Sequence, residues 1–406
     1  MSRSNSKKPK QTAKKIFGFI HLWFGLAVGL VVVIVGLTGA IYAFQPELSK
    51  ATQPWLTVKA ENKPYLPLSQ LRDIAAKQLP DKKPTRMLFK GKESALIVHF
   101  IAKKPVRYYY AVYLNPYTGE VLKTMDINDD FFRIILNGHM YLWLPQEIGH
   151  QVVGWSVVIF LLMIISGIVL WWPRNKAARK NSFKVKWSAS PKRLNYDLHN
   201  VFGFYASWVL IFVVITGLVW SFEWVENTEY KLLTGKNKPK VPTPASVKVA
   251  ATDGQHPLDK ILNTVTTTYT NTDRFTVGLP PTDTACVTVR IYPDENTNYR
   301  MNYLYFDQYT AAAIKPGKSW NSYEEANVGE KASRMNYDIH TGAIAGLPGR
   351  ILVFFAGLIA ASLPITGFYI WWGKKKKAKK PARKSQRTVQ QPETTIQPVL
   401  TASSQQ

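Results

Sequence analysis

The chain has 406 residues and carries 52 Lys and Arg against 26 Asp and Glu, a formal net charge of +26 at pH 7. In a soluble protein this charge would suggest a nucleic-acid partner. Here the basic residues lie beside long apolar runs, so we interpret them as topology signals and contacts with anionic lipid, and we expect no nucleic-acid binding. The single cysteine, Cys286, excludes an internal disulfide and any iron–sulfur cluster or thiolate zinc site held by this chain alone.

Four stretches are long and apolar enough to cross a bilayer, whose hydrocarbon core of ~30 Å needs about 20 helical residues. In chain order we predict a basic N-terminus (1–15), a first transmembrane helix (16–45), an outside segment (50–148), a second helix (149–173), a basic loop (174–199), a third helix (200–225), a second outside segment (226–348), a fourth helix (349–373) and a basic, disordered tail (374–406). We interpret the first helix as a retained anchor, because its apolar run is long for a signal peptide and no cleavage site follows it closely.

The basic segments fall on one side of the membrane if the chain crosses it four times. They are the N-terminus, the loop before the third helix and the run "GKKKKAKKPARK" after Trp372. The positive-inside rule makes this side cytoplasmic, so we expect both termini inside and both long polar segments outside.

Each outside segment has the pattern of a small α+β domain. In the first, "PLSQLRDIAAKQL" has helical periodicity, and "RMLFKG", "SALIVHFI" and "RYYYAVYLNPYTGEVL" are typical of strands and turns. In the second, a helix in "PLDKILNTVTTTY" precedes the strand segments "FTVGL", "CVTVRIY" and "MNYLYFDQYTAAAI". Neither segment contains a recognisable catalytic constellation.

The chain repeats itself at a slowly growing offset. His21 and His199 lie 178 residues apart, "YLNPYTGEVL" and "YFDQYTAAAI" lie 192 apart, and "GIVLWWP" and "GFYIWWG" lie 200 apart. We therefore predict a membrane α-helical fold with four transmembrane helices, an internal tandem repeat and two α+β extracytoplasmic domains, the halves being related by an axis along the membrane normal.

Four of the seven histidines occupy repeat-related places. His21 and His199 begin the first and third helices at the cytoplasmic end, while His139 and His340 precede the second and fourth helices at the outer end. Ionisable side chains in or against a membrane are costly and usually functional. The alternative is that these histidines only anchor helices at the interface. The remaining ones include His99, in a predicted strand, and His256, in a loop, for which packing or surface roles are expected.

Paired imidazoles on opposed helices suit haem iron, because zinc gathers three or four protein ligands in one shell. We predict an inner haem between His21 and His199 and an outer haem between His139 and His340. Gly25 and Gly203 each follow an inner histidine by one turn, where a missing side chain would let the macrocycle approach the backbone. The inner and outer layers would lie roughly 20–30 Å apart.

The identity of the outer ligand in the first half stays open. His139 has the repeat counterpart His340, whereas His150, at the start of the second helix, has the counterpart Arg350. The repeat favours His139, but His150 lies closer to the membrane in sequence. Arg350 is a candidate partner for a haem propionate through charge-assisted hydrogen bonds.

The motifs "HLWFGLAVGLVVVIVGLTGAIYAFQPEL", "GIVLWWPR" and "NYDLHNVFGFY" resemble the PepSY-associated transmembrane family over about residues 16–373. This resemblance implies PepSY domains at about 65–125 and 255–320 facing the periplasm, a bacterial inner-membrane location, b-type haem and a role as an iron-regulated protein or ferric-siderophore reductase. The second PepSY copy departs from the first in its final turn, with "QYTAA" in place of "PYTGE", which puts the geometry of that turn in question.

Three functional hypotheses follow. The first is a membrane oxidoreductase with two b-type haems that reduces a ferric siderophore or other iron chelate outside. Its electrons come from a quinol or from a cytoplasmic or membrane donor, since the chain has no G-x-G-x-x-G fingerprint. The second is a non-enzymatic PepSY-bearing sensor or assembly partner. The third, a transporter, is disfavoured because no charged residue lies near the middle of an apolar run.

Overall fold

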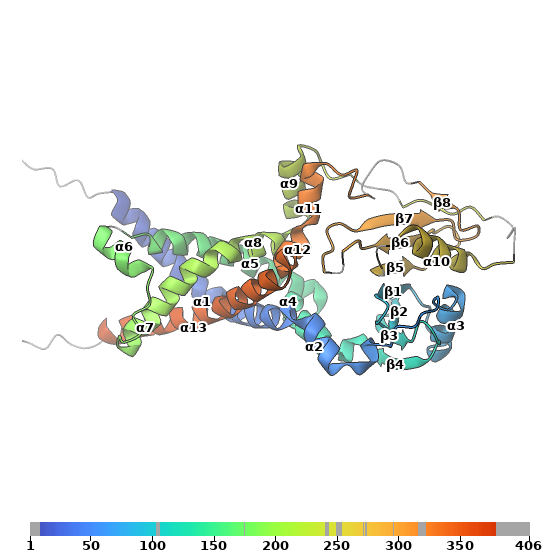
Figure 1. Cartoon of the computed structure of the whole chain (residues 1–406). Helices are drawn as coiled ribbons and strands as arrows, with labels where there is room; N and C mark the ends of the chain where they lie inside the picture. Colours follow the sequence, from blue (N-terminus) through green and yellow to red (C-terminus); the bar gives the residue numbers. More distant parts are fainter. Residues whose placement is uncertain are drawn as a thin grey trace, which may run out of the picture.

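The computed structural model describes residues 9–102, 106–173, 175–239, 243–248, 254–270, 272, 274–294, 296–315 and 322–378. The first eight residues and the tail from 379 onward, which belong to the predicted basic ends, lie outside this range. The described chain forms a long helical bundle with a β-sheet domain at one end (Figure 1).

Four helices long and apolar enough to cross a membrane confirm the predicted number of spans. They are α1 (Pro9–Ala43), α5 (Gln146–Trp171), the continuous run of α7 (Pro191–Asp197), η3 (Leu198–Phe202) and α8 (Gly203–Ser221), and α13 (Gly346–Ala378). The third span begins earlier than predicted, because α7 leads through a π-helical turn, η3, straight into α8. Single π-helical turns inside α-helices are frequent at functional sites.

Small residues let α1 and α13 pack backbone against backbone. A Cβ built on Gly36 of α1 would meet the carbonyl oxygen of Gly357 of α13 at 2.8 Å, and one on Gly357 would meet the oxygen of Gly36 at 3.0 Å. Because lipid gives no hydrophobic drive for helix association, such small residues let two helix backbones pack directly. Larger side chains, among them Phe160, Leu210 and Leu218, fill the core between α5 and α8.

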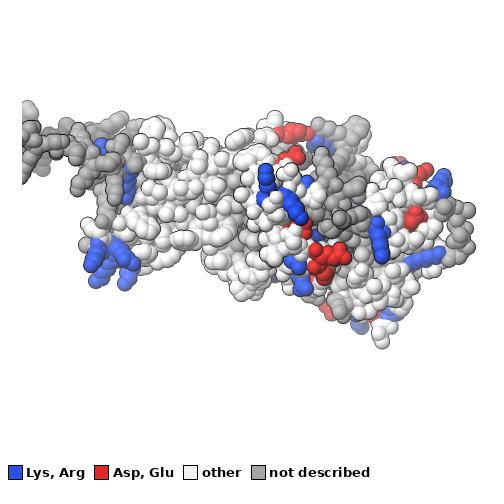
Figure 2. Space-filling view, turned by 90° about the horizontal axis from the view of Figure 1, so that it is seen from above, with Lys and Arg blue, Asp and Glu red and all other residues white. Residues whose placement is uncertain are grey.

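The charge on the bundle is confined to its ends. Figure 2 shows Lys and Arg gathered at the end with α6 (Lys176–Ser182) and α7, a broad uncharged belt, and acidic residues only toward the sheet. The described ends of the chain lie at the α6 and α7 end, opposite the sheet (Figure 1). The uncharged belt is the surface that a hydrocarbon core requires.

Short helices join the bundle to the sheet domain. They are α2 (Gln45–Thr52), η1 (Pro54–Leu56), η2 (Ile127–Asp129), α4 (Phe131–Tyr141), α9 (Glu223–Thr234), α11 (Val328–Arg334), α12 (Asn336–Thr341) and η4 (Ala343–Ala345). The Asp130 side chain caps α4 by accepting hydrogen bonds from the backbone N–H groups of Phe132 and Arg133. Gly149 and Gly349, 200 residues apart, let the ends of α4 and α12 press against the starts of α5 and α13, where a Cβ would lie 2.2 Å or less from a backbone oxygen.

The strands form one antiparallel sheet in the order β4-β3-β2-β1-β5-β6-β7-β8. Their bounds are β1 (Arg86–Lys90), β2 (Leu96–Ala102), β3 (Tyr108–Leu114), β4 (Val121–Asp126), β5 (Arg274–Gly278), β6 (Val287–Ile291), β7 (Asn302–Phe306) and β8 (Ala313–Ile314). The sequence predicts two separate α+β domains, but β1 and β5 pair directly across the centre of a continuous sheet. This pairing removes two edges that would otherwise expose unpaired backbone groups.

Helices α3 (Leu68–Gln78) and α10 (Pro257–Thr268) cover one face of the sheet. Beneath them lies a buried apolar core that includes Leu71, Phe89, Ile261 and Phe275. The rings of Phe89 and Phe275 stack with centroids 4.4 Å apart where β1 meets β5. The core is therefore shared by both units and holds them together as one body.

The last turn of each unit has the same backbone despite its different sequence. Gly119 of the first unit has φ +76°, and Ala311, at the equivalent place in the second, has φ +60°. Glycine takes this left-handed conformation without a steric cost, whereas alanine does not. The "QYTAA" departure therefore keeps the turn at the expense of local strain, and β8 after it has only two residues.

Candidate functional site

The structure brings four histidines together as two pairs. In the inner pair, His21 of α1 and His199 of η3 have ring centroids 6.4 Å apart and ring planes at 90°. In the outer pair, His139 of α4 and His340 of α12 have centroids 6.1 Å apart and planes at 68°. Each pair therefore takes one histidine from each half of the chain.

A serine or threonine on another helix of the same half holds each imidazole through Nδ1. For the inner pair, Ser166 Oγ lies 3.0 Å from His21 Nδ1 and Thr366 Oγ1 lies 2.9 Å from His199 Nδ1. The outer contacts are longer, at 3.5 Å from Thr38 to His139 and 3.4 Å from Thr216 to His340. The outer rings instead lie close to backbone oxygens, with His139 Nδ1 2.9 Å from Val35 and His340 Nδ1 2.8 Å from Val213.

These partners fix the tautomer of the imidazoles. A carbonyl oxygen only accepts, so His139 and His340 carry their proton on Nδ1. Ser166 and Thr366 donate their own hydroxyl protons to carbonyls of their helices, those of Met163 and of Ser362 and Leu363, and so accept from the inner imidazoles. Within the described residues none of the four Nε2 atoms has a hydrogen-bond partner, which leaves Nε2 as the unprotonated nitrogen in each ring.

The histidine-facing glycines follow these hydroxyl residues directly. A Cβ on Gly39 would lie 2.8 Å from His139 Cε1, and one on Gly217 would lie 3.0 Å from His340 Cε1. At the inner pair the corresponding distances are 3.3 Å from Gly167 to His21 and 3.2 Å from Gly367 to His199. Every spanning helix thus presents one Ser/Thr-Gly step to one imidazole, with the glycine making room and the hydroxyl beside Nδ1.

The sequence pattern alone does not reveal a role for these Ser/Thr-Gly steps. The signal was present as "LTG", "ISG", "ITG" and "ITG", one in each apolar run. The glycines named instead, Gly25 and Gly203, face Met163 and Leu363, with a Cβ 3.1 Å and 3.3 Å from the nearest side-chain carbon. Their predicted part in making room for a macrocycle stays a prediction.

His139 reaches the bundle because α4 turns back against α1, as its contacts with Val35 and Gly39 show. His150 is not part of either pair. Its Nε2 lies 3.2 Å from the Trp220 carbonyl oxygen, and its ring lies 6.3 Å from that of Tyr141. Arg350, its repeat counterpart, forms a two-point ion pair with Glu47, with Nη1 2.8 Å from Oε2.

The two histidines outside the repeat pattern lie in the sheet domain. His256 caps α10, its Nδ1 accepting from the Leu258 backbone N–H. His99 is buried in β2, and its Nδ1 has no hydrogen-bond partner. Burial first, then the charges of Arg86 and Lys90, lower the pKa of His99 to about 3.

The two pairs lie at different depths of the bundle. His21, in the inner layer, and Gly39, which faces the outer layer, are 18 residues apart on α1, or about 27 Å of helix rise. His199 and Gly217 have the same separation on the third span. This distance is close to the thickness of a hydrocarbon core, so one pair lies near each surface of it.

Either pair alone is too small a set of ligands for a metal held only by protein. In the part of the chain that the structure describes, no group of three or more His, Cys, Asp or Glu side chains is placed to hold a metal ion. Two imidazoles that share one metal through Nε2, with bonds of about 2.0–2.1 Å, would have ring centroids roughly 6 Å apart. Both observed separations match this value, so the residues fit an iron whose other four ligands come from a porphyrin.

Outside the spans, electrostatics favour neutral outer imidazoles. Burial lowers the pKa of His139, and burial together with the neighbouring His139 lowers the pKa of His340 to about 4. Both rings are therefore neutral at physiological pH, which is the state in which imidazole binds metals.

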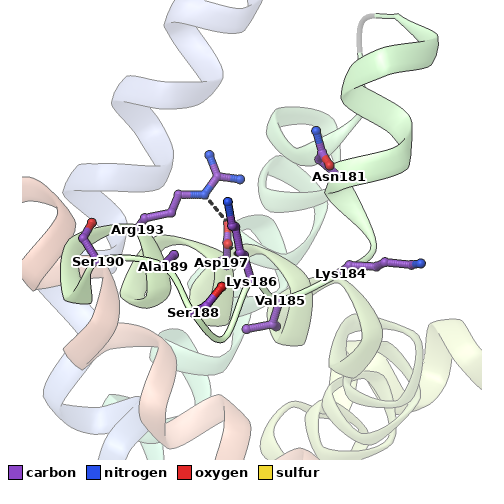
Figure 3. A pocket seen from close by; sticks show the side chains of 9 residues that line it. All are labelled: Asn181, Lys184, Val185, Lys186, Ser188, Ala189, Ser190, Arg193 and Asp197. Carbon is purple, nitrogen blue, oxygen red and sulfur yellow. Dashed lines mark hydrogen bonds and ion pairs between the residues drawn. The ribbon is translucent and has the colours of Figure 1, made fainter.

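A basic cavity of about 760 Å³ is lined by the end of α6, by α7 and by the loop between them (Figure 3). Its charged lining consists of Lys184, Lys186, Arg193 and Asp197, and the ion pair between Arg193 Nε and Asp197 Oδ1, at 2.8 Å, leaves the cavity net positive. Asn195, on the same helix, donates to the Thr366 carbonyl oxygen at 3.0 Å. The helix that lines this cavity therefore also contacts the residue that holds His199.

Together the bundle, its paired histidines and the sheet at one end define a four-span membrane protein with an extramembrane domain. The family model for the PepSY-associated TM region matches residues 19–374. The chain therefore belongs to the PepSY-associated transmembrane family. A comparison with curated proteins gave no match.

Proposed function

We propose that this protein is a haem-containing oxidoreductase of the bacterial inner membrane. In this proposal two b-type haems carry electrons across the membrane, and a ferric siderophore or other iron chelate is reduced in the periplasm. One electron is consumed for each Fe(III) converted to Fe(II). Hard oxygen donors hold Fe(II) poorly, so reduction favours release of the iron.

The observation that carries the proposal is the presence of two histidine pairs, one at each end of the bundle. In each pair the ring centroids are 6.1–6.4 Å apart, the separation expected for two imidazoles that bind one metal ion. Each ring donates its Nδ1 proton to an oxygen, and the two pairs lie near opposite ends of the bundle. When bound, haem supplies one-electron transfer between ferric and ferrous iron. Ring orientation set by a second partner at Nδ1 is the usual means by which a protein positions a histidine ligand.

The residues of this chain have distinct parts in that scheme. His21 and His199 would hold the inner haem, and His139 and His340 the outer haem. Thr38, Ser166, Thr216 and Thr366, with the backbone oxygens of Val35 and Val213, orient the imidazoles and increase their basicity. The apolar bundle core excludes water from the path between the layers.

The topology follows from charge. We infer that the end with α6 and α7 is cytoplasmic, because its Lys and Arg are the positive-inside signal, and that the sheet is periplasmic (Figure 2). Electrons would then enter at the inner pair, from a quinol or from a cytoplasmic or membrane donor. We also infer that the two halves are tandem copies, each with one PepSY-type unit, because their strands pair symmetrically about Leu88 and Thr276.

Absorption spectroscopy tests the proposal. Protein purified from cells with adequate haem supply is expected to show a reduced-minus-oxidised b-type spectrum with about two haems per chain. Because both pairs have ring planes far from parallel, the oxidised protein should give a strongly anisotropic low-spin EPR signal. A colourless, folded preparation would end the proposal and leave a non-enzymatic sensor or assembly partner.

A further inference from the structure

The sheet face turned away from α3 and α10 carries an unusual concentration of positive charge. Residues opposed in an antiparallel pair share a face, and here the central strands oppose Arg86 to His99, Lys90 to Arg274, and Thr276 to Arg290. Their neighbours Met87, Phe89, Phe275, Val277, Val289 and Ile291 point into the apolar core on the other face. We call Arg86, Lys90, Arg274 and Arg290, on β1, β5 and β6, the cationic face.

Most of this charge has no carboxylate partner among the described residues. Within the described residues, Arg86, Lys90 and Arg290 have no acidic partner; Arg86 instead donates to the Tyr109 hydroxyl at 3.1 Å. Arg274 is the exception: it donates to the backbone oxygens of Asp294 and Thr297 and to the Asn298 side chain, and it also interacts electrostatically with the Asp338 carboxylate. Lys90 lies directly opposite Arg274, an arrangement of like charges that destabilises a sheet.

The surroundings make this arrangement costly. The Lys90 side chain is open to solvent, yet its pKa is lowered, first by the desolvating protein around it and then by Arg274. His99 Nδ1 and Arg86 Nε are buried without a hydrogen-bond partner. The like charges of Lys90 and Arg274 need compensation, and an anion bound beside Lys90 would supply it.

The cationic face belongs to the side of the sheet that meets the outer end of the bundle. Arg133 of α4 lies 5.4 Å from the centre of the Tyr109 ring on β3. Asp338 of α12 accepts hydrogen bonds from the backbone N–H groups of Asn298 (3.0 Å) and Tyr299 (2.7 Å), in the loop after β6. The helices that contact this side, α4 and α12, are those that carry His139 and His340.

We propose that the cationic face binds the ferric chelate, and that this chelate is an anion: a ferric ion held by carboxylate or catecholate oxygens, with a net negative charge. The assignment rests on the proposed reductase function and adds the substrate class. Arginine and lysine bind such oxygens through charge-assisted hydrogen bonds. Reduction adds one electron, and hence one negative charge, to the bound complex, so surrounding cations favour it electrostatically.

Redox-inert gallium(III) complexes test the proposal without any electron transfer. The probes are the tris-catecholate complex, with charge −3, and the neutral tris-acetohydroxamate complex, titrated into the full-length protein by calorimetry. We expect the anionic complex to bind about tenfold or more tightly than the neutral one, with the difference shrinking as salt is added. Equal affinities for the two complexes would overturn the proposal.

Variants locate the site. Lys90→Gln combined with Arg290→Gln should remove about tenfold of the affinity for the anionic complex and leave the neutral complex unaffected. Lys77→Gln, on the exposed side of α3 beyond the opposite face, is the matched control and should change neither affinity. If the double variant does not fold, Lys90→Gln alone, at an exposed position, should still weaken the anionic complex about threefold. Unchanged binding in the folded variants would place the anion elsewhere and overturn the assignment.

The haem spectrum of the same samples separates this inference from the function on which it rests. Haem-containing protein that binds both gallium complexes alike overturns the substrate class alone. Colourless protein that prefers the anion overturns the reductase and keeps an anion-binding face.

Discussion

The inner and outer histidine pairs use the same chemistry on different supports. The inner imidazoles belong to the spanning helices, and hydroxyl groups at 2.9–3.0 Å hold them. The outer imidazoles belong to short helices, and backbone oxygens at 2.8–2.9 Å hold them, with the hydroxyls at 3.4–3.5 Å. The glycines also lie closer to the outer rings than to the inner ones.

The difference shows how one device works in two settings. A helix that already spans the membrane positions its own histidine, so a side-chain hydroxyl suffices to orient the ring. A histidine on a separate short helix must also dock that helix, and a backbone carbonyl with a close glycine provides a fixed contact. We therefore expect the inner pair to depend more on side-chain hydroxyls and the outer pair more on glycine.

Of the changes considered, removal of one imidazole should have the largest effect on haem content. The layers are about 27 Å apart along α1 and share no ligand, so each should lose its haem independently. His21→Ala and His340→Ala are each expected to lower the haem content from about two to about one per chain, and the double variant to about zero. Haem quantitation on detergent-purified protein measures this.

His150→Ala is the matched control, because His150 contacts the Trp220 carbonyl oxygen and neither pair. It should keep its full haem content. If His21→Ala emptied both sites, the two layers would not be independent. If His150→Ala lost haem and His139→Ala kept its full haem content, the outer ligand would be His150 and not His139.

Substitution of the histidine-facing glycines should come next in size. In Gly39→Ala the new Cβ would lie 2.8 Å from His139 Cε1, a distance that real contacts do not tolerate, so we expect loss of most of the outer haem. In Gly167→Ala the distance to His21 is 3.3 Å, and a small shift of the ring should preserve most of the inner haem.

Gly18→Ala serves as the control for the glycine series. Its Cβ would lie 3.9 Å from a side-chain carbon of Leu170, an ordinary contact, and we expect near-normal haem content. Each glycine variant is combined with a substitution of one histidine of the other layer, so that the haem spectrum reports only the layer under test. A larger loss in Gly167→Ala than in Gly39→Ala would reverse the proposed dependence.

Removal of a hydroxyl should shift potentials rather than occupancy. An Nδ1–H that donates to an oxygen makes imidazole a stronger donor to ferric iron, so its loss should raise the reduction potential. For Ser166→Ala and Thr366→Val we expect about 20–60 mV at the inner site, the equivalent of about one hydrogen bond. Thr38→Val and Thr216→Val should shift the potential of the outer site less, because both variants keep the backbone oxygens that lie 2.8–2.9 Å from Nδ1 of His139 and His340. Redox titration followed by absorbance decides, and equal shifts in both layers would contradict the comparison.

The helices and strands could be predicted from the sequence because each depends on a pattern within its own segment. Apolar length predicted four spans, and alternation predicted the segments that form β1 to β8. The pairing of β1 with β5 was not predicted, because it joins segments almost 190 residues apart and nothing local to either strand specifies its partner. The π-helical turn at His199 has no sequence signal that we recognise.

The histidines were recognisable as candidates because the repeat marked them, but their supports were not. Ser/Thr-Gly steps are common in membrane helices, and their role follows only once helix packing places Ser166 beside His21 and Thr38 beside His139. Similarly, Gly25 follows its histidine by one turn on the same helix, but the glycine that faces His21 comes from α5. Local spacing therefore gave no indication of Gly167, while the predicted part of Gly25 in making room for a macrocycle stays a prediction.

The smallest expected effect concerns Arg350, where the two halves differ. The sequence indicates this residue as a candidate partner for a haem propionate, and in the structure it forms an ion pair with Glu47 of α2. This ion pair is partly buried, with the Arg350 side chain 18% and the Glu47 side chain 47% exposed, and it should contribute about 1 kcal/mol, so Arg350→Gln should lower the melting temperature by about 1–3 °C. Glu47→Gln should do the same, and the double variant should be no worse than either, because both changes remove one interaction. If the ion pair is the only role of Arg350, neither Arg350→Gln nor Glu47→Gln should change the potential of the outer haem. A shift in Arg350→Gln that Glu47→Gln lacks would instead show that the arginine also acts on the cofactor, which a redox titration of the two variants side by side will reveal.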